Sequence, residues 1–276
     1  NPPVSARADR GNWMKASDKP RYGSWVAPRL IVRCAILTLL FGEAAVALCL
    51  FAPDLTALIA IVTVPAVLFA GCTVYFLNAK RLFAPGGGDI QNRVLDLLVD
   101  RIDWNGEGSA LDIGCGSGAL AVKLARRYPQ ARITGLDFWG AAWAYGKAQC
   151  ERNAALEGVG SQTEFMQGSA FSLPFADGAF DLVVSNMTFH EVKGVTDKRG
   201  LVREALRVLR PGGAFVFQDL FLLRSYFGTP DELLAAAKAA GAGEVHFEPT
   251  HTAPFIPKAL KLPFMLGAMG VLRGKK

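Results

Sequence analysis

The chain has 276 residues, of which 51% are hydrophobic, and its formal net charge is +6. This length allows one large domain or two small ones, and the hydrophobic fraction is high for a purely water-soluble domain. The five cysteines include no pair at metal-ligand spacing. This excludes a disulfide framework and a zinc site as the basis of the fold, and no metal is expected.

The positive charge lies at the two ends of the chain. Residues 1–33 hold seven basic and two acidic side chains, and residues 255–276 hold five basic side chains and no acidic one. Basic ends around an acidic middle favour an anionic membrane surface over a nucleic-acid groove as the partner. Solubilising tails are the alternative explanation.

Two apolar runs follow the polar start of the chain. Residues 34–53 hold one charged side chain, Glu43, and residues 55–79 hold none. Each run is long enough, at about 1.5 Å per helical residue, to cross a hydrocarbon core of about 30 Å. The expected segments are an N-terminal segment at 1–29, a transmembrane helical hairpin at 30–79 with helices at 30–52 and 55–77, and a linker at 80–88.

Basic side chains flank this hairpin on both sides and predict its orientation. Arg21, Arg29 and Arg33 lie before the hairpin or at its start, and Lys80 and Arg81 follow it. By the positive-inside rule we expect both ends in the cytoplasm, with the remaining domain, 89–276, on that side. A signal peptide for the first run, or two helices of a buried soluble core, are the alternatives.

Strands and helices alternate through residues 89–276. This alternation predicts an α/β fold with a doubly wound, mostly parallel seven-stranded sheet and helices on both faces. The expected strands are 109–113, 131–136, 162–166, 180–185, 213–219, 244–248 and one near 267–273. The expected helices are 89–101, 119–127, 140–157, 197–209 and 231–240.

Residues 109–118, Ser-Ala-Leu-Asp-Ile-Gly-Cys-Gly-Ser-Gly, predict a strand, a tight turn and the start of a helix. A side chain at Gly114, Gly116 or Gly118 would hinder the turn, the approach of a ligand or the helix–strand packing. The spacing also fits the degenerate Gly-x-Gly-x-x-Ala fingerprint of dinucleotide sites. However, Asp112 puts a carboxylate where a pyrophosphate should lie, and this favours a cationic ligand.

The pattern Asp-x-Gly-x-Gly-x-Gly at 112–118 resembles the first motif of class I S-adenosylmethionine-dependent methyltransferases. Residues 168–181, with Gly-Ser-Ala followed by Leu-Pro-Phe, resemble the segment between the third and fourth strands in the small-molecule, type 11-like branch of that family. The resemblance covers about residues 90–276. It implies the Rossmann-like methyltransferase fold and S-adenosylmethionine as the cofactor.

The resemblance also implies which residues hold the cofactor. Asp137, at the end of the second strand, can accept both hydroxyls of a ribose, and Phe138 can cover the adenine. Ser169 stands where the family usually has an aspartate that takes the adenine amino group, and its neutral hydroxyl is a weaker acceptor. The expected cofactor-binding residues are Asp112, Gly114, Cys115, Gly116, Gly118, Asp137, Phe138, Ser169, Ala170, Phe171 and Asn186.

The fourth strand ends in Asn-Met-Thr-Phe-His-Glu at 186–191, the family position that faces both the methyl donor and the acceptor. His190 and Glu191 are the expected catalytic residues, because either can take a proton from an acceptor hydroxyl or amine. A structural role for each is the alternative. The Asn/Asp-Pro-Pro-aromatic signature of enzymes that methylate nucleic-acid bases is missing, so no nucleic-acid partner is expected.

These features predict a membrane-anchored methyltransferase of the plasma (inner) membrane with a cytoplasmic catalytic domain. The expected partners are the bilayer and an amphipathic, membrane-resident acceptor such as a phospholipid amine or a quinone-like or isoprenoid compound. The proline-interrupted, basic and apolar stretch 255–264 is expected to dip into the headgroups. A soluble metabolite or protein acceptor, and a non-catalytic protein that binds S-adenosylmethionine, are the alternatives. The sequence does not indicate the oligomeric state.

Overall fold

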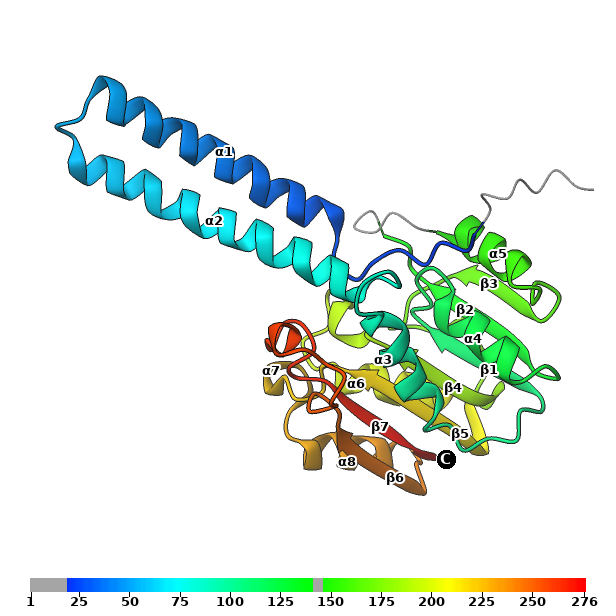
Figure 1. Ribbon diagram of the computed structural model, residues 1–276. Helices are drawn as coiled ribbons and strands as arrows, with labels where there is room; N and C mark the ends of the chain where they lie inside the picture. Colours follow the sequence, from blue (N-terminus) through cyan, green and yellow to red (C-terminus); the bar gives the residue numbers. More distant parts are fainter. Residues whose placement is uncertain (1–18, 141–145) are drawn as a thin grey trace, which may run out of the picture.

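The computed structural model describes residues 19–140 and 146–276, so the predicted N-terminal segment is described only from residue 19. A pair of long helices projects from an α/β domain (Figure 1). The chain leaves the domain at residue 27, passes along both helices and returns to the same side of the domain.

The two projecting helices, which we call the hairpin, are α1 (Pro28–Phe51) and α2 (Thr56–Phe83). They pack against each other along their length, with Phe41 and Phe69 stacked at 6.0 Å between ring centroids. Their mean hydropathies are 2.3 and 2.4, so both are long and apolar enough to cross a membrane by length and composition. Their apolar windows are 6% and 0% buried, which is not the pattern of helices inside a soluble core.

The second helix is longer than the sequence predicts. It continues past residue 77 to Phe83, so Lys80 and Arg81 lie in its last turn and the expected linker at 80–88 is helical in its first half. The reason is tertiary packing, because Ala79 and Phe83 are 1% and 2% exposed against the α/β domain. The apolar pattern alone does not reveal that contact.

The α/β domain contains a sheet in the order β3-β2-β1-β4-β5-β7-β6. β7 is antiparallel to both of its neighbours, and the other pairings are parallel. The expected seven-stranded, mostly parallel sheet is therefore confirmed. The strands are β1 (Ser109–Ile113), β2 (Arg132–Asp137), β3 (Thr163–Gln167), β4 (Phe180–Asn186), β5 (Leu209–Asp219), β6 (Glu244–Pro249) and β7 (Gly270–Lys275).

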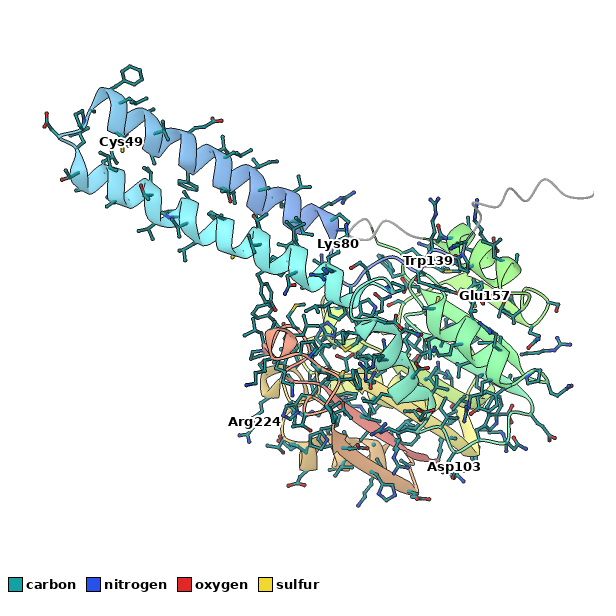
Figure 2. The ribbon with its side chains drawn as sticks, in the orientation of Figure 1. Cys49, Lys80, Asp103, Trp139, Glu157 and Arg224 are labelled. Atoms are coloured by element: carbon teal, nitrogen blue, oxygen red, sulfur yellow. The ribbon has the colours of Figure 1, made fainter. Side chains whose placement is uncertain are left out.

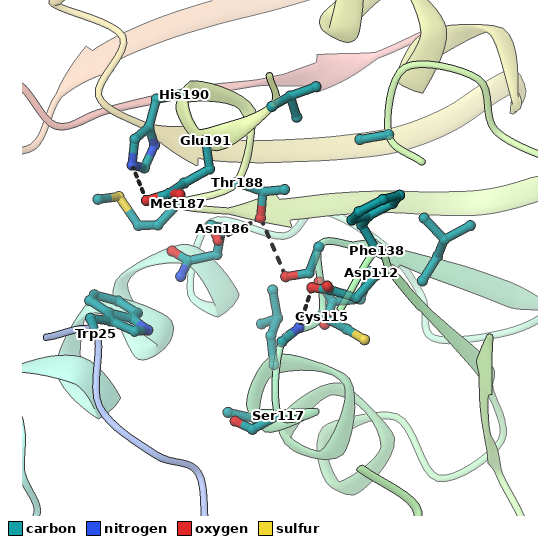
Figure 3. Close-up of a pocket in the computed structure, with 18 of the residues that line it drawn as sticks. Trp25, Asp112, Cys115, Ser117, Phe138, Asn186, Met187, Thr188, His190 and Glu191 are labelled. Atoms are coloured by element: carbon teal, nitrogen blue, oxygen red, sulfur yellow. Dashed lines mark hydrogen bonds and ion pairs between the residues drawn. The ribbon is translucent and has the colours of Figure 1, made fainter. Parts of the chain in front are cut away.

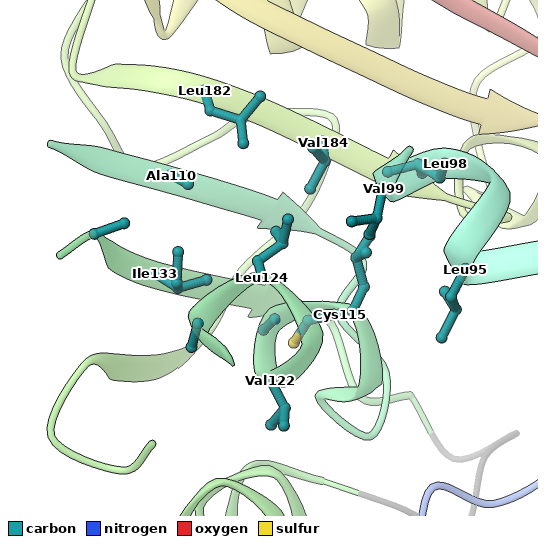
Figure 4. Close-up of a cluster of buried hydrophobic side chains, with 14 of the residues drawn as sticks. Leu95, Leu98, Val99, Ala110, Cys115, Val122, Leu124, Ile133, Leu182 and Val184 are labelled. Carbon is teal, nitrogen blue, oxygen red and sulfur yellow. The ribbon is translucent and has the colours of Figure 1, made fainter. Parts of the chain in front are cut away.

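Helices cover both faces of this sheet. One face packs on α3, α4 and α5 around Leu98, Leu124 and Ala154 (Figure 4), and the other packs on α6 and α8 around Val202 and Leu233. The helices of the domain are α3 (Ile90–Val99), α4 (Ala119–Arg127), α5 (Lys147–Leu156), α6 (Arg199–Arg207), α7 (Arg224–Phe227) and α8 (Pro230–Ala239), with 3₁₀ turns η1 (Phe189–Glu191) and η2 (Lys258–Leu260).

Two further expectations differ from the structure. The helix expected from residue 140 begins at Lys147, and residues 141–145 lie outside the described residues. The strand expected from residue 213 begins at Leu209, because the Arg-Pro-Gly-Gly stretch lies inside β5. A shift of register against β4 accommodates this stretch, with Gly212 at φ 76°, so the residues form an irregularity of the strand and not a separate turn.

The strand order places the ligand site. The chain runs outward from β1 to β3 and then crosses to β4 on the other side of β1, so the order reverses between β1 and β4. In an open, doubly wound sheet the loops leave in opposite directions at this point and open a crevice at the carboxyl ends of the strands. The glycine turn after β1 and the Asn-Met-Thr-Phe-His-Glu stretch after β4 meet there.

Candidate active site

A cavity of about 590 Å³ lies at the carboxyl ends of β1, β2 and β4 (Figure 3). It brings together most of the residues expected from the sequence. Those that line it are Asp112, Gly114, Cys115, Gly116, Asp137, Phe138, Ser169, Ala170, Asn186, His190 and Glu191.

The turn after β1 is built from glycines with left-handed backbone. The Gly114 and Cys115 N–H groups donate to the Leu136 carbonyl at 2.7 and 3.1 Å, which joins the turn to β2. Gly114 has φ 76°, and a Cβ there would lie 2.1 Å from the Thr188 side chain. The turn therefore requires glycine for its backbone conformation and also for the close approach of the β4 loop.

Asp112 lies beneath this turn, 1% exposed, and its Oδ2 has no hydrogen-bond partner among the described residues. Burial and then the nearby Asp137 carboxylate raise the pKa of Asp112 to about 8, against a smaller opposing effect of the Ala121 N–H. A buried carboxyl with one unpartnered oxygen is unfavourable when charged. A cationic ligand in the cavity would remove that cost.

Asp137 ends β2 with both carboxylate oxygens engaged by backbone. Oδ2 accepts the Gly116 N–H at 2.8 Å, and Oδ1 accepts the Trp139 N–H at 2.7 Å. Each oxygen keeps a further lone pair for a ligand hydroxyl. The next side chain, Phe138, is 67% exposed and lines the cavity. Its ring is therefore free to cover the flat face of a ligand.

Two residues of the expected set lie outside the cavity. Phe171 is 62% exposed and does not line it, although Ser169 and Ala170 do. The Ser169 hydroxyl accepts the Phe171 N–H at 3.2 Å, which turns the chain away from the site. Gly118 faces the helix side, where a Cβ would meet Phe165 and Cys150, so its role is packing.

Cys115 lines the cavity, but its thiol is unreactive. It is 6% exposed, and its hydrogen bond with Cys150, followed by burial, raises its pKa well above the ordinary value. The thiol therefore stays protonated at neutral pH and is not a nucleophile.

The loop after β4 presents the residues expected to act in catalysis. Asn186 is fixed by a hydrogen bond from Gln218 Nε2 to its Oδ1 at 2.7 Å, and Met187 follows with φ 53°. His190 is largely buried in η1, with Nδ1 2.6 Å from Asp219 Oδ1. Glu191 is exposed, with Oε1 3.7 Å from His190 Nε2. The sequence did not identify Asp219, which ends β5.

The N-terminal segment is a second part of the site that the sequence did not identify. Tyr22 and Trp25 line the cavity, and Trp25 packs on Phe83 with 5.5 Å between ring centroids. The Ser117 hydroxyl donates to the Tyr22 carbonyl at 2.7 Å, and Asn153 binds both the N–H and the carbonyl of Arg21. The sequence shows here only two aromatic residues before an apolar run, a pattern typical of a membrane interface and not of a ligand site.

Comparison with known proteins agrees with this geometry. A family profile described as "Methyltransferase domain" matches residues 111–217. The demethylmenaquinone methyltransferase of Deinococcus radiodurans is 31% identical over 201 residues, 66% of this chain and 79% of that protein. This chain belongs to the S-adenosylmethionine-dependent methyltransferase family. The expected cofactor is thereby confirmed.

Two further comparisons agree with this membership. The malonyl-[acyl-carrier protein] O-methyltransferase of Geobacter sulfurreducens is 38% identical over 155 residues, 55% of this chain and 52% of that protein. The chain thus spans about half of this relative. The crystal structure of the geranyl diphosphate C-methyltransferase of Streptomyces coelicolor has the same fold, with a TM-score of 0.51 at 16% identity, over 68% of this chain and 79% of that one.

S-adenosylmethionine fits the residues of this cavity. Its positive charge matches the Asp112 carboxyl, whose Oδ2 lacks a hydrogen-bond partner among the described residues, and its ribose hydroxyls match the remaining lone pairs of Asp137. When bound, this cofactor supplies a methyl group activated by a sulfonium. The methyltransferase then has to align the acceptor and exclude water.

We predict that Gly114→Ala weakens cofactor binding at least tenfold, whereas Gly158→Ala leaves it unchanged. The two glycines have φ 76° and 75°, but a Cβ at Gly158 meets nothing within 4 Å. Both substitutions cost about 1 kcal/mol of backbone strain, and only the first also displaces Thr188. Thermal unfolding and calorimetric titration with S-adenosylmethionine measure both effects. Equal losses of affinity in the two variants would contradict the assigned role of the turn.

We predict that S-adenosylmethionine binds more tightly as the pH rises from 6 towards 8, and that binding releases a proton. The pKa of Asp112 is raised from 3.8 to about 8, so the protonated form dominates at neutral pH until a cation binds. Calorimetry in two buffers of different ionisation enthalpy measures the released proton. In the Asp112→Asn variant the release should disappear and the affinity should fall. Unchanged proton release in that variant would show that another group is responsible.

We predict that Ser169→Asp tightens S-adenosylmethionine binding about fivefold, because a charged acceptor forms a hydrogen bond stronger by about 1 kcal/mol. Ser169→Ala is the matched control and should weaken binding. Titration calorimetry compares the three proteins. A weaker Ser169→Asp variant would mean that position 169 does not face the adenine amino group.

Proposed function

We propose that the chain is a membrane-anchored methyltransferase that transfers the methyl group of S-adenosylmethionine to a membrane-associated, lipid-like small molecule. The observation that carries this proposal is that one cavity joins the glycine turn to the base of the hairpin. Trp25, just before α1, and Phe83, the last residue of α2, line the same cavity as Asp112 and Asp137. An acceptor that enters beside the hairpin can therefore reach the methyl donor through one continuous space.

The surface of the hairpin supports anchoring in a bilayer. Large apolar side chains are exposed along both helices, for example Leu50 at 69%, Phe51 at 86% and Val67 at 65%. Exposure of so large an apolar surface is unfavourable in water, whereas in a hydrocarbon core it is favourable. Lys80 lies at the base of the hairpin and Cys49 near its far end (Figure 2), so the basic residues are on the side of the catalytic domain.

A surface loop beside the hairpin, residues 255–264, supports entry of the acceptor from the bilayer. The Tyr75 hydroxyl of α2 donates to the Ala259 carbonyl at 2.9 Å, which holds the loop against the helix. Leu262 and Phe264 are 40% and 61% exposed, and Phe264 also lines the cavity. Residues 56–75 span about 30 Å at 1.5 Å per residue, the thickness of a hydrocarbon core. The loop would then lie among the headgroups.

The names of the relatives are compatible with a lipid-like acceptor, but they do not indicate one particular compound. The name of the Deinococcus relative gives demethylmenaquinone as its acceptor, whereas that of the Geobacter relative gives a malonyl group on an acyl-carrier protein. A soluble or protein acceptor, with the hairpin acting only as an anchor, is thus the second candidate. A membrane protein that binds S-adenosylmethionine without transferring its methyl group is the third.

The test is methyl transfer from labelled S-adenosylmethionine into a membrane extract, followed by organic–aqueous partition. We expect the label in the organic phase with the 276-residue protein, and much less of it with Gly114→Ala at limiting cofactor. Label in the aqueous or protein fraction would overturn the lipid-like acceptor and leave the hairpin as an anchor. Cofactor binding without transfer into any fraction would support the non-catalytic candidate.

We predict that Leu262→Glu lowers methyl transfer to membrane-held acceptor severalfold without changing S-adenosylmethionine affinity. A carboxylate at this site disfavours contact with acyl chains and anionic headgroups. Phe171→Glu is the matched control, since Phe171 is 62% exposed, does not line the cavity and lies on the β3–β4 connection. Vesicle-bound protein and labelled cofactor give the rates. Equal rates in both variants would remove the loop from the proposed entry route.

A further inference from the structure

The carboxylate of Asp219 accepts several hydrogen bonds next to the cavity residues Thr188 and His190. It is 1% exposed. Oδ2 accepts the N–H groups of Thr188 and Phe189 at 3.0 and 2.7 Å, and Oδ1 accepts the N–H of Leu220 at 2.6 Å. The fourth contact is His190 Nδ1, 2.6 Å from Oδ1. Three backbone N–H groups and the imidazole therefore contact this one buried carboxylate.

This arrangement determines the tautomer of His190. An ionised carboxylate can only accept, so the hydrogen of a neutral imidazole is on Nδ1, which donates to Asp219. Nε2 then keeps the lone pair, on a ring that lines the cavity and is 18% exposed. Figure 3 shows the ring extending from η1 towards the Glu191 carboxylate, 3.7 Å from Nε2. The ring is thus oriented as a base directed at the cavity.

The charges around His190 make it a stronger base than free imidazole. Burial lowers its pKa, but the Asp219 carboxylate, its hydrogen bond and the Glu191 carboxylate together raise the pKa above the ordinary 6.5. Lys198, held by the Val192 carbonyl, opposes this rise, and Lys193 is a further cation on the cavity wall. Since the base is the neutral form, its population increases as the pH rises through the raised pKa.

We propose that His190 is the base that removes the proton from an acceptor hydroxyl, and that Asp219 positions it for this role. The proposal rests on the methyl-transfer function proposed above. The acceptor O–H bond breaks and its proton goes to Nε2, while the oxygen electron pair forms the bond to the methyl carbon. The carbon–sulfur bond of the sulfonium breaks, its electron pair stays on sulfur, and S-adenosylhomocysteine is left.

This assignment narrows the acceptor class to a hydroxyl-bearing amphipathic molecule. A neutral amine attacks through a lone pair that needs no prior loss of a proton, whereas a hydroxyl becomes a strong nucleophile only as its proton leaves. The pair also has a structural effect, because Asp219 fixes the backbone of residues 188–189. A test must therefore separate the chemistry of the imidazole from the shape of the loop.

The first measurement is the tautomer, by ¹⁵N NMR of the 276-residue protein in detergent with labelled histidine. The chain has only three histidines, and His190→Gln identifies the signal that belongs to His190. We expect the Nδ1–H form in the parent protein and the Nε2–H form in Asp219→Asn, whose amide can donate to Nδ1. His251→Gln is the control and should leave the signal unchanged. An Nε2–H form in the parent protein would overturn the proposal independently of any activity.

The second measurement is the pH profile of kcat with labelled S-adenosylmethionine and membrane extract. We expect kcat of the parent to rise with pH on its acidic side, and to fall about 10²-fold or more in His190→Gln and Asp219→Asn. Glu191→Gln should move the rise to lower pH, because it removes a charge that raises the pKa of His190. S-adenosylmethionine affinity should remain within a few-fold in all three variants.

The outcomes distinguish this inference from the proposed function. Label in the organic phase with an unchanged kcat and pH profile in His190→Gln overturns the base and leaves the function intact. Label in the aqueous or protein fraction overturns the lipid-like acceptor, and the variants then decide the base with that fraction as substrate. No transfer into any fraction overturns both.

Discussion

Two carboxyl groups, those of Asp112 and Asp137, lie close together beside the glycine turn, and the rest of the site depends on holding them there. Asp112 is buried without a partner for Oδ2, while Asp137 binds the Gly116 N–H at 2.8 Å. Their repulsion, added to burial, raises the pKa of Asp112. The protein without its cofactor bears this cost, and a cation between the strand ends relieves it. The site therefore favours a positively charged ligand, independently of its contacts with the adenosine.

The sequence predicted the parts of the site that one continuous stretch encodes. The glycine turn, Asp112 and Asp137 follow directly from strand ends and turn residues, and the structure brings them into one cavity. The doubly wound, mostly parallel sheet was predicted as well, because strands alternate with helices along the chain. Phe171 shows the limit of this reasoning, because adjacency to Ser169 did not indicate that the chain turns the side chain outward.

Contacts between distant stretches could not be predicted from these patterns. Asp219 lies 29 residues from His190 and reaches it only because β5 is next to β4. Trp25 and Phe83 are separated in sequence by the whole hairpin, yet their rings are in contact at its base. This packing accompanies the extension of α2 beyond the predicted helix. In both cases the local sequence predicts the helix or strand, but the contact between the distant residues arises only from tertiary packing.

The N-terminal segment has a consequence for how the enzyme meets its substrate. Asn153 and Ser117 hold residues 21–22 against the glycine turn, and α1 begins only a few residues later. In the proposed arrangement the cavity therefore keeps a fixed tilt and height relative to the bilayer plane. The acceptor is then supplied by lateral diffusion in two dimensions, and saturation follows its surface density. Adding inert lipid at constant total acceptor would slow the enzyme by surface dilution alone.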